Sequence, residues 1–373
     1  AQSTIFTQAI TQGSSTPPAV KALLSSTYAY EHDGPTSRLS PVRPYLPALL
    51  SESGYTTGGI VTNLYLESPR GWGRGFSEYD DCSTSKVYKS KFLFRSVNQA
   101  ARRMGRPLQW PVSLPAEELV QRADRWIQKV RRPFFLWIQT MDTHWPYRLQ
   151  RFSLNPTWQK NQKFDRQVVR PRLISAAPGF SREERAVLLE QYTQAVRYTD
   201  QVLGAFLEKL EQAGTLENTV VALTADHGEE FGEHGRYFHS AHLYDELVHV
   251  PLILRLPHSE KSWPASWDQQ VRLIDLAPTF LELAGQNVSK LDSLRGESLL
   301  PLLRGQTDGE RMALSQAFTG QDYALRWKGC KYLFNPVTGR EELYRLDQDP
   351  GEIHNCLEDY RATAQEFRAA LEP

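Results

Sequence analysis

Apolar residues recur along this chain in two patterns, one with helical spacing and one in short continuous runs. The helical spacing predicts helices over residues 17–26, 45–53, 116–130, 182–213 and 271–285. The continuous runs predict buried strands at 58–63, 133–140, 219–225 and 250–256. Because helices and strands alternate, we predict an α/β fold with a mostly parallel central sheet and helices on both faces.

The pattern changes after about residue 311. The stretch "DYALRWKGCKYLFNP" predicts a hairpin that turns at Lys328-Gly329, "EELYRL" predicts another strand, and residues 357–371 predict a final helix. Residues 148–180 are rich in Pro, Arg and Gln and show no clear period, which predicts a long surface excursion. We therefore expect a main domain over 1–310 and a small antiparallel α+β subdomain over 311–373.

The charges balance, with 43 Lys+Arg and 43 Asp+Glu in 373 residues. Because the net charge is zero, no overall positive electrostatic potential favours nucleic acid. Any recognition of an anion must therefore depend on a local group of residues. No apolar run reaches the roughly 20 residues of a membrane span. The three cysteines show no CxxC spacing, and we expect idle thiols, with a Cys330–Cys356 bridge as the alternative. No signal peptide is evident, and a cytoplasmic or a periplasmic location both stay open.

Polar clusters stand at the ends of predicted strands, where open α/β sheets bind their ligands. "MDTHWPY" follows the strand 133–140, and "ADHGEEFGEHG" follows the strand 219–225. "GSSTPP" at 13–18 precedes a helix and would offer backbone N–H groups to an anion.

Asp226 and His227 combine a hard carboxylate with an imidazole, which suits a divalent metal, while Gly228 lets the backbone turn sharply. A turn whose Asp caps the next segment is an equally good interpretation. The following Glu233-His234-Gly235 is more typical of a solvated loop than of a ligand set.

Three further histidines are candidates for chemistry. His144, two residues after Asp142, could donate to a ligand oxygen or act as a general acid, although a lone turn histidine more commonly packs. Of His239 and His242, one could face the site while the other packs or caps.

Thr16 is predicted as the N-cap of the first helix, with Pro17 at its first position. A hydroxyl there lies in positive potential, where a bound metal could lower its pKa and make it a nucleophile.

Together these stretches resemble the sulfatase family of the alkaline phosphatase superfamily along nearly the whole chain. The family's nucleophile segment C/S-x-P-x-R corresponds to "TPPAVKALLSS", with Thr16 at the nucleophile position and Pro18 at the proline. Other matching blocks are "YLPALLSESGYTTGGIVTN", "FFLWIQTMDTHWPY", "NTVVALTADHGEEFGEHG", "LYDELVHVPLIL", "IDLAPTFLELAG" and "ELYRLDQDPGE".

The resemblance implies a site in which Asp226 and His227 hold a divalent cation against Thr16. Ca²⁺ is the expected ion, with Mg²⁺ or Mn²⁺ as alternatives. His144 would contact the ester oxygens or the leaving group, and His239 would stand near the family's sulfate-binding Lys or His. The remaining predicted substrate-binding residues are Lys21, Asp142 and His242, and the partner is a small anionic ester.

The chain departs from the family pattern in three ways. Threonine cannot become the formylglycine of sulfatases, and is the nucleophile of related phosphodiesterases and phosphonate hydrolases. The family arginine falls at Val20. The family's first strand, which ends in metal-binding aspartates, is expected to be missing, since the chain starts inside the segment that follows it.

Two functions follow as hypotheses. The first is a metal-dependent hydrolase of sulfate esters or of related phosphate and phosphonate esters. The alternative is an inactive or truncated sulfatase-fold protein that binds anionic ligands.

Overall fold

The computed structural model describes residues 3–32, 34, 36–81, 113–147, 164–169, 172, 179–239, 241–257, 263–306 and 310–371. The chain divides into two compact units. Unit 1 comprises residues 1–53, 214–230 and 238–373, and unit 2 comprises residues 54–213 and 231–237. The predicted domain boundary at 310 stays a prediction.

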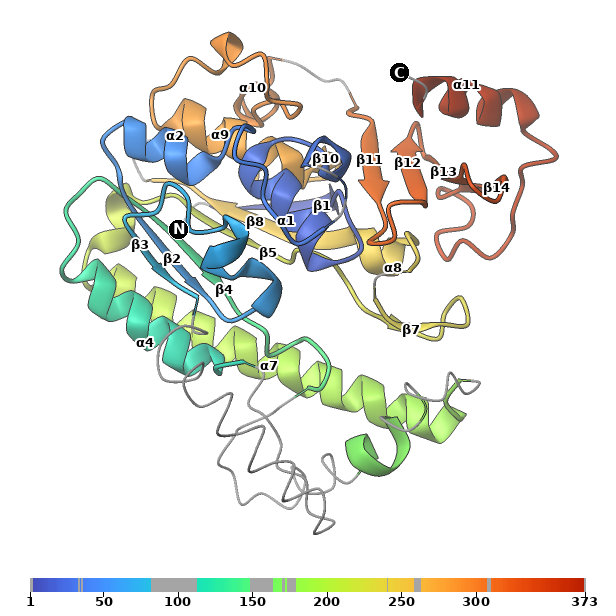
Figure 1. Ribbon diagram of the computed structural model, residues 1–373, viewed down its shortest axis with the longest axis horizontal. Coiled ribbons are helices and arrows are strands. Elements are labelled where there is room, and N and C mark those ends of the chain that lie inside the picture. Colours follow the sequence, from blue (N-terminus) through green and yellow to red (C-terminus); the bar gives the residue numbers. More distant parts are fainter. Residues whose placement is uncertain are drawn as a thin grey trace. The chain divides into compact units, whose positions relative to one another are not determined.

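The main sheet of unit 1 is mixed (Figure 1). Its strands follow the order β10 (Val271–Arg272), β1 (Ser3–Ile10), β8 (His249–Arg255) and β5 (Val221–Thr224), and β9 (Ser266–Trp267) also pairs with β1. β8 runs antiparallel to both β1 and β5, whereas β9 and β10 run parallel to β1. The predicted strands 219–225 and 250–256 are therefore confirmed.

Strand β1 was not predicted. Residues 3–10 were assigned to a segment that follows a strand, but they pair along β8 from Ser3 to Ile10. The apolar run is interrupted because a threonine, Thr4, is one of the inward-facing residues. Phe6 and Ala9 nevertheless pack into the core of unit 1 with Leu252.

The predicted helices of unit 1 are present with small shifts. They are α1 (Thr16–Ser25), α2 (Leu46–Glu52) and α9 (Leu276–Leu283). The N-cap prediction is wrong by one residue, because Ser15 has the extended cap backbone and Thr16 is already helical. The first residues of the predicted helix 271–285 form β10 and a 3-10 turn instead.

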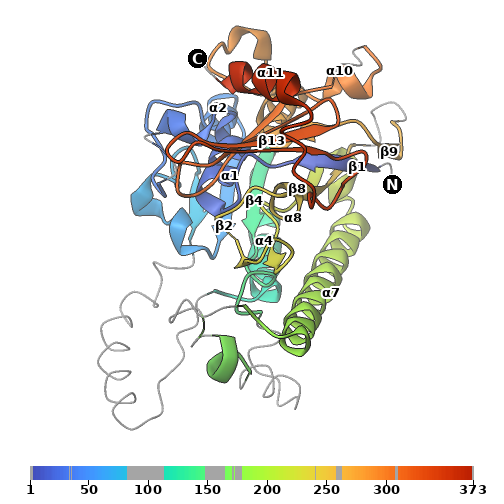
Figure 2. The same ribbon diagram turned by 90° about the vertical axis from the view of Figure 1, so that its right-hand side faces the viewer.

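The C-terminal part of unit 1 contains an antiparallel sheet of β11 (Ala313–Gln316), β12 (Tyr323–Trp327), β13 (Cys330–Asn335) and β14 (Arg340–Arg345). The hairpin turns at Lys328-Gly329 as predicted, with positive φ at both residues. Helix α11 (Arg361–Leu371) lies along this sheet (Figure 2). Its Phe367 packs against Tyr332 of β13. Cys330 and Cys356 are free thiols.

Unit 2 contains a parallel sheet in the order β3 (Glu78–Asp80), β2 (Thr56–Val61) and β4 (Phe134–Gln139). Helices α4 (Ala116–Ile127) and α7 (Arg182–Gln212) lie side by side (Figure 1). Leu119 of α4 and Phe206 of α7 pack against Ile60 of β2, which explains the helical spacing of apolar residues in both helices. Most of the predicted surface excursion 148–180 lies outside the described residues.

The remaining elements are short. They are β6 (Glu230–Phe231), β7 (Tyr237–Phe238), α8 (Asp245–Val248), α10 (Leu300–Leu303), a short π-helix at Asp165–Val169, and 3-10 helices at Ala29–His32, Leu64–Leu66, Ser68–Arg70, Thr215–Asn218, Leu273–Asp275 and Val288–Lys290. Among the helices in the described ranges, none has the length and apolar content to cross a membrane.

Candidate active site

The segment that carries Thr16 is fixed to the end of β5. The hydroxyl of Thr11, just after β1, donates to the backbone oxygen of Asp226 at 2.6 Å. The hydroxyl of Ser315 donates to the backbone oxygen of Thr11 at 2.5 Å. β1, β5 and β11 thus hold together the two stretches that the sequence singled out, 13–18 and 224–228.

The N-terminus of α1 presents three consecutive buried hydroxyls. Ser14, Ser15 and Thr16 are 0%, 4% and 4% exposed. The Oγ atoms of Ser14 and Ser15 have no hydrogen-bond partner among the described residues. Because buried hydroxyls are normally paired and the first backbone N–H groups of a helix carry positive potential, this end of α1 is suited to an anion.

The turn after β5 brings Asp226 and His227 together. Asp226 Oδ2 is buried without a hydrogen-bond partner in the described part of the chain, and lies 3.9 Å from His227 Nε2. His227 Nδ1 lies 2.8 Å from the backbone oxygen of Gly228. A carbonyl oxygen only accepts, so Nδ1 carries the proton and the lone pair of the neutral ring is on Nε2, toward Asp226.

Gly228 is required at this turn. Its N–H donates to the backbone oxygen of Leu247 at 2.8 Å. A Cβ atom on Gly228 would lie 2.0 Å from the backbone oxygen of Glu246. The turn therefore packs directly on the backbone of α8.

Two consecutive glutamates each hold one of the candidate histidines. Glu229 Oε1 lies 2.8 Å from His239 Nδ1, and Glu230 Oε1 lies 2.8 Å from His242 Nδ1. The two carboxylates are 5% and 1% exposed. Each Nδ1 donates to a carboxylate, which fixes the orientation of its ring.

His227 and His239 are neighbours, with ring centroids 4.3 Å apart. Burial lowers the pKa of both histidines, more than the nearby carboxylate of Asp226 raises it. Both rings are therefore neutral at neutral pH. His242 instead packs its edge against Tyr244, with ring centroids 5.2 Å apart.

The sequence did not single out Glu229 and Glu230 as functional residues. The available signal was the pairing of two adjacent acids with the two histidines of "FHSAH". Each glutamate is ten or more positions from its histidine, and the sequence alone does not show which residues at that separation are in contact. Only the fold shows this pairing.

The C-terminal sheet anchors the histidine-bearing segment through buried charges. Lys331 of β13 is 0% exposed, and its Nζ lies 2.9 Å from Asp245 Oδ1 and 3.0 Å from Glu352 Oε1. Asp245 is three residues beyond His242. Tyr244 donates to Glu342 of β14 at 2.8 Å. The position of His242 therefore depends on this sheet.

The three other predicted residues are Lys21 in unit 1 and Asp142 and His144 in unit 2. The Nζ of Lys21, 0% exposed in α1, donates to the backbone oxygen of Gly34 at 2.8 Å. Asp142 and His144 belong to unit 2, in the loop after β4, where His144 Nδ1 contacts the backbone oxygen of Trp145. Their roles in substrate binding and catalysis stay predictions.

The donors for a metal ion are few. A buried carboxylate oxygen without a partner beside a neutral imidazole is a suitable start for a divalent cation. However, no group of three or more His, Cys, Asp or Glu among the described residues could hold a metal. Asp226 and His227 alone do not fit an ion that takes about six ligands.

The protein is of the α/β class, and Thr11 joins the N-terminal segment of α1, which is suited to an anion, to the Asp226–His227 turn. Residues 1–286 match the family model of the sulfatases, and residues 232–372 match the model of the C-terminal region of N-sulphoglucosamine sulphohydrolase. Because the first match covers more than half of the chain, the protein belongs to the sulfatase family. The resemblance seen in the sequence is confirmed.

Similar proteins support this assignment. The chain is 29% identical over 199 residues to an N-acetylglucosamine-6-O-sulfatase of Bacteroides thetaiotaomicron, covering 49% of this chain and 35% of that protein. It is 27% identical over 296 residues to arylsulfatase K of Xenopus laevis, covering 68% of this chain and 54% of that protein. The matches thus span about half or less of these relatives' own lengths.

Solved structures show the same fold. A phosphonate monoester hydrolase of Agrobacterium radiobacter has a TM-score of 0.73 at 18% identity, with 99% of this chain and 88% of that chain covered. A protein solved with its substrate D-glucosamine-2-N,6-O-disulfate has a TM-score of 0.71 at 17% identity, with 99% and 90% covered. The predicted α/β class with a small antiparallel C-terminal sheet is confirmed.

Proposed function

We propose that the protein hydrolyses sulfate esters or related phosphate and phosphonate esters, with Thr16 as the nucleophile. The observation that carries this proposal is the link from Thr11 to Asp226, which joins the N-terminus of α1 to the Asp226–His227 turn. The unpartnered Oγ atoms of Ser14 and Ser15 support an anionic group at the same place.

The proposed reaction proceeds in two steps. Thr16 Oγ1 loses its proton and attacks sulfur or phosphorus, and the bond to the leaving oxygen breaks as that oxygen takes up a proton. Water then attacks the covalent intermediate, and the sulfate, phosphate or phosphonate group leaves as its acid while Thr16 regains its hydroxyl. Backbone N–H groups at the start of α1 stabilise negative charge on the non-bridging oxygens.

His239 is the proposed proton-transfer group of unit 1. Glu229 fixes the Nδ1–H tautomer of His239, so that Nε2 of the neutral ring can take or return a proton. His144 is proposed to assist the leaving group, and Asp142, His242 and Lys21 to support substrate binding. The role of His144 follows from the family pattern at that position, whereas Lys21 is next to Val20, where the family arginine falls.

Threonine at the nucleophile position favours phosphorus over sulfur, because sulfatases use an aldehyde hydrate that threonine cannot form. The fold neighbour that hydrolyses phosphonate monoesters accords with this preference. A sulfated saccharide is the competing substrate, as in the neighbour solved with a glucosamine disulfate.

A divalent cation, with Ca²⁺ the expected ion, is proposed to bind with Asp226 and His227 among its ligands. The test uses thermal denaturation of the full-length gene product with and without Ca²⁺, Mg²⁺ or Mn²⁺. Binding to the folded state raises the melting temperature, and Asp226→Asn should abolish that rise. An equal rise in wild type and Asp226→Asn would contradict this assignment.

The reaction is tested with an ester panel on the full-length gene product. Aryl sulfate, aryl phosphate mono- and diesters and an aryl phosphonate are compared, with Thr16→Ala as the control. Turnover that is lost in Thr16→Ala supports the proposal, and the preferred ester decides between sulfur and phosphorus. No turnover by the folded, metal-supplied protein would leave the alternative, a sulfatase-fold protein that binds anions.

A further inference from the structure

Unit 1 contains a cavity lined mainly by polar residues, none of which belongs to the candidate active site. Its volume is about 370 Å³, and its walls come from Gln8 of β1, Asp268, Gln269 and Gln270 before β10, Glu310, Arg326 of β12 and Gly329. This volume lies in the range of about 300–1,000 Å³ typical of small-molecule sites. The cavity is therefore large enough for a small ligand.

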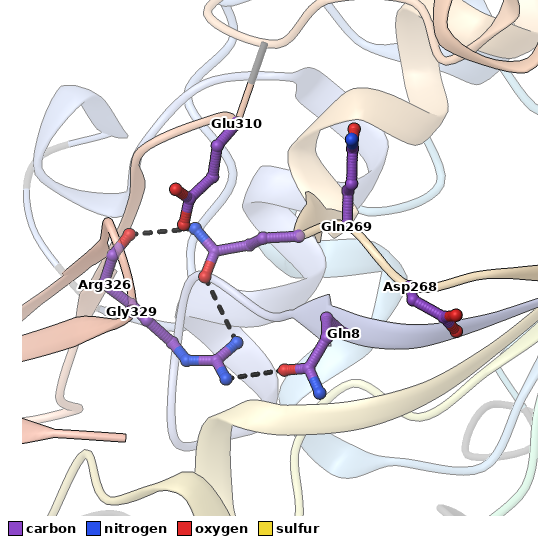
Figure 3. A pocket seen from close by; sticks show the side chains of 7 residues that line it. Gln8, Asp268, Gln269, Glu310, Arg326 and Gly329 are labelled. Carbon is purple, nitrogen blue, oxygen red and sulfur yellow. Dashed lines mark hydrogen bonds between the residues drawn. The ribbon is translucent and has the colours of Figure 1, made fainter. Parts of the chain in front are cut away.

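The floor of the cavity is a preorganised array of hydrogen bonds around Arg326 (Figure 3). Arg326 donates to Gln8 Oε1 at 2.6 Å and to Gln270 Oε1 at 3.1 Å. The amide nitrogen of Gln270 donates to the backbone oxygens of Arg311 and Arg326 at 2.6 and 2.9 Å. These contacts hold the side chains of Arg326, Gln8 and Gln270 in place before any ligand arrives.

The charges of the cavity argue against an ionic ligand. Asp268 and Glu310 are exposed carboxylates at its sides (Figure 3), and they would repel sulfate, phosphate or a carboxylate. Arg326, the cation of the lining, already lies 3.5 Å from Asp245 Oδ2 and would repel an ammonium group. A neutral ligand avoids both penalties.

The hydrogen-bonding groups favour a polyhydroxylated ligand. Amide and guanidinium N–H groups donate, whereas amide and carboxylate oxygens accept, and sugar hydroxyls can do both. Of the two Asp268 oxygens, Oδ1 accepts from Thr7 and Ser266 at 3.0 and 2.9 Å, which fixes the carboxylate at the rim. We propose that this cavity binds a neutral saccharide unit, at a place separate from the hydrolytic site.

The test measures binding of lactose, cellobiose and N,N′-diacetylchitobiose to the full-length Thr16→Ala protein by ¹H–¹⁵N NMR titration. This variant keeps the result independent of hydrolysis, so the ester panel and the binding test can fail separately. At least one neutral disaccharide should bind with a Kd of about 1–10 mM, the range expected of a few hydrogen bonds at a polar surface.

Gln8→Ala and Glu310→Ala should each weaken that binding about fivefold or more, as expected for loss of one hydrogen bond. Gln286→Ala is the matched control, since the amide of Gln286 contacts Ser53 and not the cavity. If Gln8→Ala fails to fold, Glu310→Ala alone tests the proposal. Glu310 is exposed, so its replacement should not prevent folding.

Two results would overturn the proposal. One is that no disaccharide binds at about 50 mM, well above the expected Kd. The other is that binding is the same in Glu310→Ala as in Gln286→Ala. Competition by inorganic sulfate at the cavity residues would also contradict it, because the carboxylates at the rim disfavour an anion.

Discussion

The imidazole rings of His227 and His239 lie with their centroids 4.3 Å apart, although twelve positions separate them in the sequence. One ring belongs to the turn after β5 and the other to the segment before α8. Glu229 accepts a hydrogen bond from the ring of His239 and is only two residues from His227 in the sequence. A short stretch of chain thus contributes a carboxylate, two imidazoles and the acid that orients one of them.

Glu229→Gln should lower kcat about tenfold to a hundredfold, the usual cost of losing an orienting carboxylate. The matched control is Glu230→Gln, which removes the same charge from the neighbouring pair with His242. We expect Glu230→Gln to change KM more than kcat, because His242 is proposed to bind substrate. Steady-state kinetics of both variants on the preferred ester measure the difference. Equal losses of kcat in the two variants would contradict the separate roles proposed for His239 and His242.

Stability should fall as the pH drops below about 6.5. Burial lowers the pKa of His227 and His239 from the ordinary 6.5, despite Asp226 and the nearby Glu229 and Glu230. The unfolded chain therefore takes up protons first, and each histidine contributes up to about 1.4 kcal/mol of lost stability per pH unit between 6.5 and its lowered pKa.

Urea denaturation at pH 8, 6.5 and 5.5 measures this slope, and His239→Gln should reduce it by about half. A slope in His239→Gln equal to that of wild type would contradict the prediction.

Lys331→Met should destabilise the protein by about 3–5 kcal/mol, because it leaves Glu352 buried without its cation and Asp245 with Arg326 alone. Lys328→Met is the control: this lysine pairs with Glu366 at the surface, and its loss should cost less than about 1 kcal/mol. Chemical denaturation followed by tryptophan fluorescence compares the two variants. Similar effects would mean that the buried cluster does not anchor the sheet.

Gly228→Ala should destabilise the protein by about 1–3 kcal/mol, because its methyl group meets the backbone oxygen of Glu246. Gly204→Ala in α7 is the contrast, since a methyl group there meets nothing within 4 Å. It should stabilise by about 0.5–1 kcal/mol through helix propensity. Thermal denaturation distinguishes the two, and a neutral Gly228→Ala would contradict the close packing of this turn.

The elements that were predicted from sequence are those with strong local patterns. Helices α4 and α7 and strands β4, β5 and β8 were identified because apolar spacing or continuous apolar runs mark them. β1 was missed, because Thr4 and other polar residues interrupt its apolar pattern although Phe6 and Ala9 are buried. Long-range pairing with β8, which the sequence does not display, makes this segment a strand.

The candidate site was predictable in part for the same reason. Asp226, His227 and Thr16 occupy motif positions next to predicted elements, so the sequence identified them. The pairing of Glu229 with His239, and of Glu230 with His242, depends on the path of the loop before α8, which places residues 239 and 242 next to residues 229 and 230. No local sequence pattern predicts the path of this loop.

The nucleophile at Thr16 is tested most directly by trapping the covalent intermediate. The full-length protein is mixed with an aryl phosphonate, quenched in acid within the first turnover and digested for peptide mass analysis. We predict a phosphonyl adduct on the peptide at Thr16, which is absent from Thr16→Ala. Turnover without an adduct, or an adduct on another residue, would contradict the assignment of Thr16 as the nucleophile.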